Sequence, residues 1–366
     1  MAEVKAGDAQ PVGVKGAAEF EKSLANADTR VASFDVHDRS PIEKIQHFLH
    51  SRPSSVPLLV LILSVALFGI ANGSKFFSPF ALTLILQQVA IVGIVGAAQT
   101  LVILTAGIDL SVGAILVLCS VVMGKFSVNY GLPPIVGLGA GLLLGLACGA
   151  FNGLLVAYVK LPPFIVTLGT WQIYSAANFI YAANETIRSQ DIDAQAPLLH
   201  FLANKVEFGK ANFTFAVFLM IIIAALLWYV LNHTAWGRHV YAIGDDPEAA
   251  RLSGINVQRK LISVYALAGL ICAIAGWALI GRIGSVSPLG GQTANIDAIT
   301  AAVIGGTSLF GGRGSIVGTM FGALIVGVFG LGLRLVGTDP QWTFLSVGAL
   351  IIIAVAIDQW IRKVSA

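Results

Sequence analysis

From about residue 56 onward, the chain alternates long apolar stretches with short polar segments. Most of these stretches have the roughly 17–25 apolar residues that a helix needs to cross a bilayer. The alternating ten-residue segments of a transmembrane β-barrel are absent. The sequence therefore predicts an all-α, polytopic transmembrane bundle of about ten spans. We place these spans at residues 56–72, 79–105, 110–128, 134–158, 163–182, 212–231, 261–281, 297–310, 315–336 and 341–361.

Composition supports a membrane protein with one large membrane domain and a polar tail. Of the 366 residues, 56% are hydrophobic and only 11% are charged, whereas about 25% are charged in a soluble domain. Residues 1–51 mix acidic and basic side chains and contain few large apolar ones. Such a segment cannot form a packed core. We expect residues 1–51 to be a largely disordered cytoplasmic tail and residues 52–366 to be the transmembrane domain.

The distribution of positive charge predicts the orientation in the membrane. An even number of spans puts both termini on the same side, and Arg362 and Lys363 near the end favour the cytoplasmic side. The same count places the segment 232–260 in the cytoplasm and the segment 183–211 on the opposite side of the membrane. We therefore expect a multi-pass membrane protein with both termini in the cytoplasm.

The longest polar interruption in the second half of the chain contains a short helix with both ends marked. Asp246 can cap its first backbone N–H groups, Pro247 fits its first position, and Gly254 provides a left-handed stop. A helix this short cannot be stable alone in water. Either it is one capped turn of an ordinary loop, or it docks on a partner. The candidate docking residues are Asp246, Pro247, Glu248, Ala249, Ala250, Arg251, Leu252, Ser253 and Gly254.

Two carboxylates lie among the apolar spans, where a charge is costly and normally faces protein or water. Asp109 belongs to the stretch TAGIDLSVG, and it can either cap the following helix or face a substrate route. Asp297 is another N-cap or pore-facing candidate, and the glycines of 305–314 after it should break the helix. Ile108-Asp109 and Ile296-Asp297 also hint at an internal repeat of the kind found in many transporters.

Uncharged amides in the spans can bind sugar hydroxyls, but they also join helices to one another. For any single amide, the interhelical role is favoured. The candidates for a translocation path are Asp109, Ser111, Gln87, Gln88, Gln99, Asn152, Asn295 and Asp297.

Glycine and proline mark two further features. Glycine recurs at every fourth residue through one span, at 137, 141, 145, 149 and 153. This spacing places a small-residue stripe on one helix face, which permits close approach of another backbone. The stripe predicts either a sliding helix pair or static packing. Pro162-Pro163 should force a sharp entry into the next span.

Several classes of function lack their signature residues. The chain contains no Gly-x-x-x-x-Gly-Lys-Ser/Thr phosphate-binding loop, so we expect no ATP site of that kind on this chain. We expect no metal site, because the six histidines lack ligand spacing, and no nucleic-acid binding, because there is no basic stripe. An ion-coupled transporter or a channel would bury a chain of ionisable groups, for which only Asp109, Asp297 and Asp358 qualify.

These stretches together resemble the permease subunits of ribose-type sugar ABC importers. The matching segments are TAGIDLSVG (105–113), Asn152-Gly153 with LPPFIVTLGT (161–170), GRHVYAIGDDPEAARLSGI (237–255) and GGTSLFGGRGSIVGT (305–319). More narrowly, the chain resembles rhizobial-type fructose importer permeases in the segments 76–113 and 183–188, in GTDPQWTFL and in IIIAVAIDQWIRKV. The resemblance covers about residues 56–361.

This resemblance implies a fold like that of type II ABC importers, with broken helices and two pseudo-repeats. It also implies a non-catalytic permease that imports a monosaccharide, fructose first and ribose or mannose as alternatives. The short helix of 246–254 would fit a cleft on a separate ATPase subunit, which holds the ATP and Mg²⁺. The other implied partners are a periplasmic sugar-binding protein, a second copy of the permease, and membrane lipid. The resemblance further implies that the protein lies in the bacterial inner membrane, with the segment 183–211 in the periplasm. An ion-coupled sugar transporter or channel remains the alternative.

Overall fold

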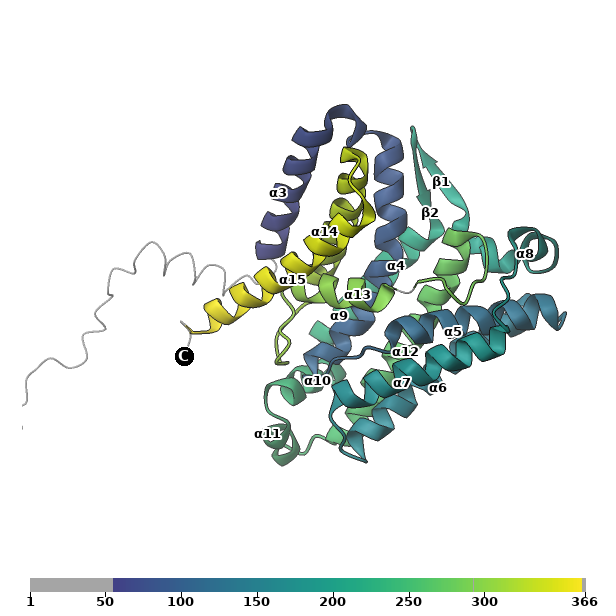
Figure 1. Ribbon diagram of the computed structural model, residues 1–366. Helices are drawn as coiled ribbons and strands as arrows, with labels where there is room; N and C mark the ends of the chain where they lie inside the picture. Colours follow the sequence, from purple (N-terminus) through teal and green to yellow (C-terminus); the bar gives the residue numbers. More distant parts are fainter. Residues whose placement is uncertain (1–54, 292, 364–366) are drawn as a thin grey trace, which may run out of the picture. The chain divides into compact units, whose positions relative to one another are not determined.

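The computed structural model describes residues 55–291 and 293–363, and this part of the chain is almost entirely helical (Figure 1). The predicted tail, residues 1–51, lies outside the described residues. The long helices are α3 (Ser55–Asn72), α4 (Pro79–Leu104), α5 (Val112–Gly124), α6 (Pro134–Ala157), α7 (Pro163–Ala182), α9 (Phe215–His233), α12 (Val257–Ile283), α14 (Ile316–Val336) and α15 (Pro340–Lys363). A shorter apolar helix, α13 (Ala294–Ile304), precedes α14.

Each of the ten predicted spans corresponds to a helix. Within the described residues, seven helical segments are long and apolar enough to cross a membrane. The others are α7, which carries several polar residues, α15 and α13. The predicted span 297–310 was too long, because α13 ends at Ile304, before the paired Gly305 and Gly306. With eleven residues, α13 is a half-helix.

Short elements connect the long helices, and some were not predicted. They are η1 (Gly73–Lys75), the π-helical η2 (Lys125–Asn129), α8 (Ser189–Gln195), η3 (Pro197–Ala203), α10 (Ala235–Asp245) and α11 (Pro247–Leu252). The purely α-helical expectation missed one hairpin, β1 (Lys205–Phe208) with β2 (Ala211–Thr214), whose strands pair antiparallel with Phe208 opposite Ala211. Its turn contains Gly209 at a φ of 62°, a conformation that glycine adopts without strain.

The helices form two repeats of four, α4–α7 and α12–α15. The second helices of the repeats, α5 and α13, occupy equivalent places: α5 packs against α6, α7 and α12, whereas α13 packs against α14, α15 and α4. In the same way α6 packs along α12, and α14 packs along α4. The first helix of each repeat therefore supports the second and third helices of the other. The repeat is larger than the two short Ile-Asp matches suggested.

The two repeats run in opposite directions. The last residue of α4, Leu104, accepts a hydrogen bond of 3.0 Å from the Gly312 N–H, beside α10. The first turns of α12 lie at the same end, because Trp236 of α10 donates to Ser263 of α12 at 2.9 Å. At the other end, the start of α4 meets the hairpin, where the Asn212 N–H donates to the Thr83 hydroxyl at 3.0 Å. We call these the α11 end and the hairpin end; they lie at the bottom and top of α4 in Figure 1.

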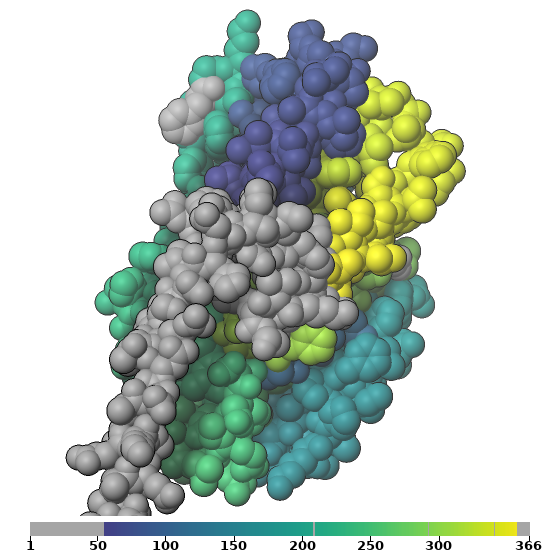
Figure 2. Space-filling model, turned by 90° about the vertical axis from the view of Figure 1, so that its left-hand side faces the viewer, coloured from purple at the N-terminus to yellow at the C-terminus, as the bar shows by residue number. Residues whose placement is uncertain are grey.

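Apolar side chains face outward as well as inward. Large hydrophobic residues are strongly exposed on the outer helices, for example Ile70 at 87%, Ile180 at 80% and Ile352 at 71%. In water, so much exposed apolar surface would cause association, whereas in a bilayer it faces lipid. Figure 2 shows α3, near the start of the described chain, beside the C-terminal helices, and α3 packs directly against α14.

The glycine stripe of α6 packs against neighbouring helices, as predicted. A Cβ added at Gly145 would lie 2.5 Å from the Gly269 carbonyl oxygen and 2.6 Å from the Ala273 Cβ, both in α12. At Gly137 and Gly141 the neighbours are instead residues of α5 and η2. The stripe therefore lets the backbones of α6 and α12 approach closely.

Candidate functional site

The short docking helix has the ends that the sequence predicts. The Asp246 carboxylate is the N-cap of α11 and accepts hydrogen bonds from the N–H groups of Glu248 (2.9 Å) and Ala249 (3.0 Å). Pro247 occupies the first helical position. After the helix, Gly254 has a φ of 84°, the left-handed conformation that ends a helix.

Most of α11 is exposed, although it is well capped. Leu252 is 86% exposed, while Ala250 is buried beneath the helix. Glu248 and Arg251 form one ion pair of 3.8 Å with both side chains largely exposed, and such a pair contributes little to stability. An exposed large apolar residue beside two charges is a surface that a protein partner can bind.

An unpredicted helix, α10, links α11 to the membrane helices. Its Gly244 is packed so tightly that an added Cβ would overlap the Leu104 carbonyl oxygen and lie 2.6 Å from the Gly312 nitrogen. Leu104 ends α4, and Gly312 belongs to the loop 305–315 between α13 and α14. We call this contact of Gly244 with Leu104 and Gly312 the junction. Through it, α10 contacts one element from each repeat directly beside Asp246.

Side chains of α10 reinforce the junction. Val240 and Ile243 are fully or almost fully buried, and the Tyr241 hydroxyl donates to the Gly314 carbonyl oxygen at 2.9 Å. Burial raises the pKa of the Tyr241 phenol above its usual value, so the hydroxyl keeps its proton and remains a donor. The link from α11 to the loop 305–315 is therefore both packed and hydrogen-bonded.

Asp109 lies in a closed polar cluster near the α11 end. Its Oδ1 accepts hydrogen bonds from the Ser111 N–H (2.7 Å) and the Ser111 hydroxyl (2.6 Å). The expectation that Asp109 caps α5 needs correction, because the N-cap residue is Ser111 and the bonds of Asp109 lie one residue before the helix. Its role is to hold the turn that leads into α5.

Three further path candidates, Gln99, Asn152 and Asn295, lie in this cluster with Asp109 and Ser111. The Asn152 amide donates to the Ser111 hydroxyl at 2.8 Å, and the Asn295 amide reaches the Leu110 carbonyl oxygen at 3.4 Å. With its amide suitably oriented, Gln99 bonds both the N–H and the C=O of Asp109, at 3.2 and 3.0 Å. The closed cluster, which Tyr174 completes by donating to Asn152 at 3.3 Å, is buried throughout. Its members are Gln99, Asp109, Ser111, Asn152, Tyr174 and Asn295.

The remaining path candidates lie near the hairpin end, in an open cluster that lines a cavity of about 480 Å³. Its members are Gln87, Gln88, Arg282, Thr293, Asp297 and Arg334. Arg282 donates to the Gln88 amide oxygen. Asp297 is not an N-cap as expected: the cap residue of α13 is Thr293, whose hydroxyl donates to Asp297 at 3.1 Å. Asp109 precedes its helix and Asp297 lies inside one, so the two are not equivalent.

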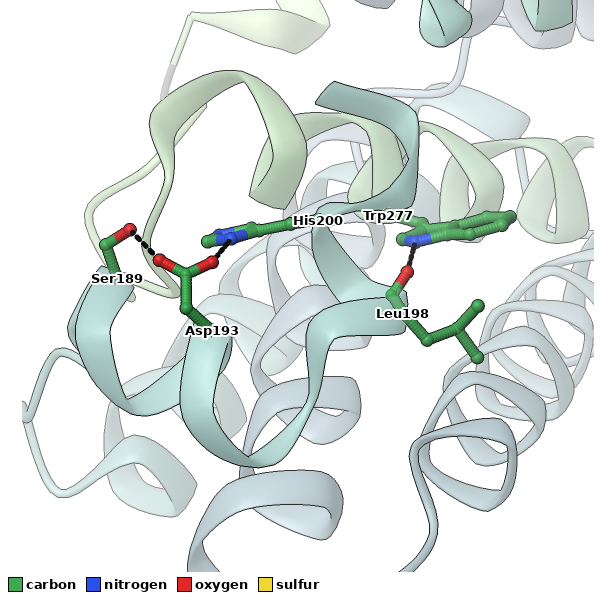
Figure 3. Close-up of polar contacts among 5 residues, drawn as sticks. All are labelled: Ser189, Asp193, Leu198, His200 and Trp277. Atoms are coloured by element: carbon green, nitrogen blue, oxygen red, sulfur yellow. Dashed lines mark hydrogen bonds and ion pairs between the residues drawn. The ribbon is translucent and has the colours of Figure 1, made fainter. Parts of the chain in front are cut away.

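The segment 183–211 contains β1 and therefore lies at the hairpin end; Figure 3 shows polar contacts that it makes. Within it, Asp193 accepts hydrogen bonds from Ser189 at 3.3 Å and pairs with His200 at 2.6 Å. The Trp277 indole of α12 donates to the Leu198 carbonyl oxygen at 3.1 Å. The segment is thereby attached to the last turns of α12, and it forms an ordered surface at this end of the bundle.

A known protein family and several known proteins match this chain over most of its length. Residues 81–355 match a family model described as the permease component of the branched-chain amino acid transport system. The chain is 69% identical to the fructose import permease protein of Rhizobium meliloti over 348 residues, which cover 95% of this chain and 97% of that protein. It is 39% identical to the ribose import permease protein of Bacillus subtilis strain 168, with 85% and 93% covered. No solved structure matches the chain.

The chain belongs to this permease family. It is a multi-pass integral membrane protein. The family's description mentions amino acids, whereas the two similar proteins above are named for sugars. A D-allose transport system permease protein of Escherichia coli strain K12 is also 34% identical over 304 residues, 83% of this chain and 91% of that protein. The matched region includes α11, the junction and both polar clusters.

Sequence reasoning about this permease missed several residues of the site. Arg282 and Arg334 were not considered, although an arginine near the end of an apolar span is a visible signal. Tyr241 and Gly244 carry no such signal in the sequence, because α10 meets the loop 305–315 only in the folded chain. Within the described residues, no group of three His, Cys, Asp or Glu side chains is arranged to hold a metal ion.

Proposed function

We propose that this chain is the membrane-spanning subunit of an ATP-driven importer and that its cargo is a monosaccharide, fructose. The observation that carries this proposal is the 69% identity to a fructose import permease over 95% of the chain. The exposed, capped α11 supports it, because an importer subunit without its own ATP site needs a docking element for a separate ATPase. ATP and Mg²⁺ would then bind to that partner, and this chain would be non-catalytic.

The same proposal assigns the other partners by the chemistry of the two ends. The ATPase would dock on α11, which places the α11 end and both termini in the cytoplasm. A sugar-binding protein would deliver its cargo to the segment 183–211 at the hairpin end, in the periplasm. A second copy of the permease would complete the complex in the lipid of the inner membrane.

Reconstitution in proteoliposomes tests the proposal. The permease with its ATPase and binding protein should accumulate labelled fructose only when ATP is supplied, and labelled ribose should be taken up more slowly. Uptake that follows an ion gradient and ignores ATP would instead establish the ion-coupled alternative.

A charge reversal on α11 tests the docking role. Glu248→Arg removes only an exposed ion pair of 3.8 Å, so the free energy of unfolding should change by less than about 1 kcal/mol. Uptake should nevertheless be lost, because the side chain that faces the partner has its charge reversed. The control is the charge reversal Lys75→Glu, at an exposed lysine of η1 that lies outside both α11 and the segment 183–211. Normal ATP-driven uptake by Glu248→Arg would show that α11 does not dock.

A further inference from the structure

The two repeats carry polar side chains at matched positions. Asn152 and Arg334 occupy the same place counted from the first residues of α6 and α14. Ser111 and Thr293 are the N-cap residues of α5 and α13, the second helices of the repeats. Because the repeats run in opposite directions, one residue of each pair lies near the α11 end and the other near the hairpin end.

A third pair follows the same relation in the first helices of the repeats. Gln87 of α4 and Tyr265 of α12 lie equally far from the starts of their helices. Tyr265 is fully buried near the closed cluster, whereas Gln87 lines the cavity of the open cluster. The matched positions therefore form one set at each end of the bundle.

The two sets differ in the bonds of Asn152 and of its match Arg334, although within the described residues the buried Tyr265 hydroxyl at the α11 end has no hydrogen-bond partner either. At the α11 end, Asn152 donates to Ser111 at 2.8 Å, and both residues are fully buried. At the hairpin end, the cavity of about 480 Å³ separates the matched residues. Within the described part of the chain, neither the Gln87 amide nor the Arg334 guanidinium has a hydrogen-bond partner.

The geometry points to this cavity as a sugar-binding subsite of the permease, reached from the hairpin end. The inference rests on the proposed function and assigns a place to its cargo. The volume falls within the range of about 300–1,000 Å³ for small-molecule sites. Amide, guanidinium and carboxylate groups can all hydrogen-bond hydroxyls, and the Phe344 ring in the cavity wall can cover a C–H face of a sugar ring.

A second cavity gives the subsite a connection to the hairpin end. This cavity of about 260 Å³ is lined by Gln87 and Arg282, and also by Lys205 of β1 and Thr214 of β2. Gln87 and Arg282 therefore border both cavities. A sugar released at the hairpin would meet these two side chains before it reached Asp297 and Arg334.

The charges favour a neutral polyol over an anionic lipid headgroup. A phosphate would be attracted by Arg282 and Arg334 but repelled by Asp297, which lies in the same cavity. A sugar hydroxyl can donate to the carboxylate and accept from a guanidinium at the same time. Every charged group of the open cluster can thus contribute to binding a sugar.

One pair of variants tests the subsite by transport. Gln87→Leu should lower fructose uptake about tenfold, the factor that one lost hydrogen bond to a hydroxyl explains, and uptake should fall more than ATP hydrolysis does. The matched control is Gln172→Leu, because Gln172 is an exposed amide of α7 that lines neither cavity. Equal, unchanged uptake in the two variants would overturn the inference. Fructose uptake by the unaltered complex tests the proposed function separately.

Thiol labelling tests occupancy directly in the full complex. Thr343→Cys introduces a thiol into the cavity wall, and the native Cys119, Cys148 and Cys272 are buried and should react slowly. Fructose at twice its dissociation constant should slow labelling by a membrane-impermeant maleimide about threefold, while labelling of the control variant Ser74→Cys, at an exposed position, should not change. If fructose gives no protection but vesicles of anionic lipid do, the cavity holds a lipid headgroup and the inference is wrong.

Discussion

Replacing Gly145 by alanine should weaken the contact between α6 and α12. Gly145 lies on the stripe of α6 that faces α12, and the alanine Cβ would lie 2.5 Å from the Gly269 carbonyl oxygen. An unstrained contact between carbon and a neighbouring heavy atom is about 3.5 Å. The two backbones would have to separate by roughly 1 Å to accommodate one methyl group.

The magnitude follows from the nature of the neighbours. The obstructing atoms are the backbone carbonyl of Gly269 and the Cβ of Ala273, and neither can rotate away. Overpacking of this kind typically costs about 1–3 kcal/mol. Gly145→Leu adds three more carbon atoms at the same place and should prevent the helices from packing at all.

Gly139 in the same helix provides the control. An added Cβ there meets nothing within 4 Å. Gly139→Ala should therefore stabilise the protein by about 0.5–1 kcal/mol, because alanine loses less backbone freedom than glycine when it becomes helical. The two alanine variants should shift the unfolding midpoint in opposite directions.

Thermal unfolding in detergent, together with uptake per folded molecule, decides whether the stripe serves static packing or movement of α6 against α12. A lower midpoint with normal uptake means that the stripe serves static packing. A loss of uptake larger than the loss of folded protein means that α6 and α12 move against each other during transport. If Gly145→Ala and Gly139→Ala have equal midpoints, the close approach of α6 to α12 is refuted.

Substitutions at three further positions have defined outcomes. Asp246→Ala should lower the local stability of α11 by about 1 kcal/mol through loss of its cap, and Asp246→Asn should restore it; amide hydrogen exchange of α11 measures both. Asp109→Asn should keep much of the uptake, because an amide oxygen can still accept from Ser111, whereas Asp109→Leu should destabilise the protein by about 1–3 kcal/mol; a stable but inactive Asn variant would show that the charge itself acts. Tyr241→Phe removes the hydrogen bond to Gly314 at constant shape, so it should lower the sugar transported per ATP with a stability loss near 1 kcal/mol; an unchanged ratio would exclude this bond from coupling.

Local signals made most of the helices and α11 predictable from the sequence. Apolar length alone located the membrane helices, since a bilayer accepts little else. Side chains that act within one turn fixed α11, because Asp246, Pro247 and Gly254 determine its ends without help from the rest of the fold. The same local logic places the start of α7 at Pro163.

Features that depend on distant segments could not be predicted in this way. The sequence around Asp297 suggests an N-cap, but α13 begins at Ala294 because Thr293 takes that position. Likewise, Gln87 and Asn152 are both amides in apolar spans, yet one lines a cavity and the other is sealed in a buried cluster. The packing of the two repeats decides between these outcomes, and it is not visible in either span alone.

If α11 docks on an ATPase as proposed, the junction provides a path from this short helix to both repeats. Gly244 is in contact with Leu104, the end of the first helix of one repeat, and with Gly312, in the loop after the half-helix of the other. Backbone atoms on both sides leave no soft side chain to absorb a displacement. A movement of α10 by even part of an ångström therefore has to shift α4 and the loop 305–315 together, since close-packed interiors transmit strain. The closed cluster includes Asp109, in the turn after Leu104, and the open cluster includes Asp297 of α13. A displacement of α11 would therefore be transmitted to both clusters.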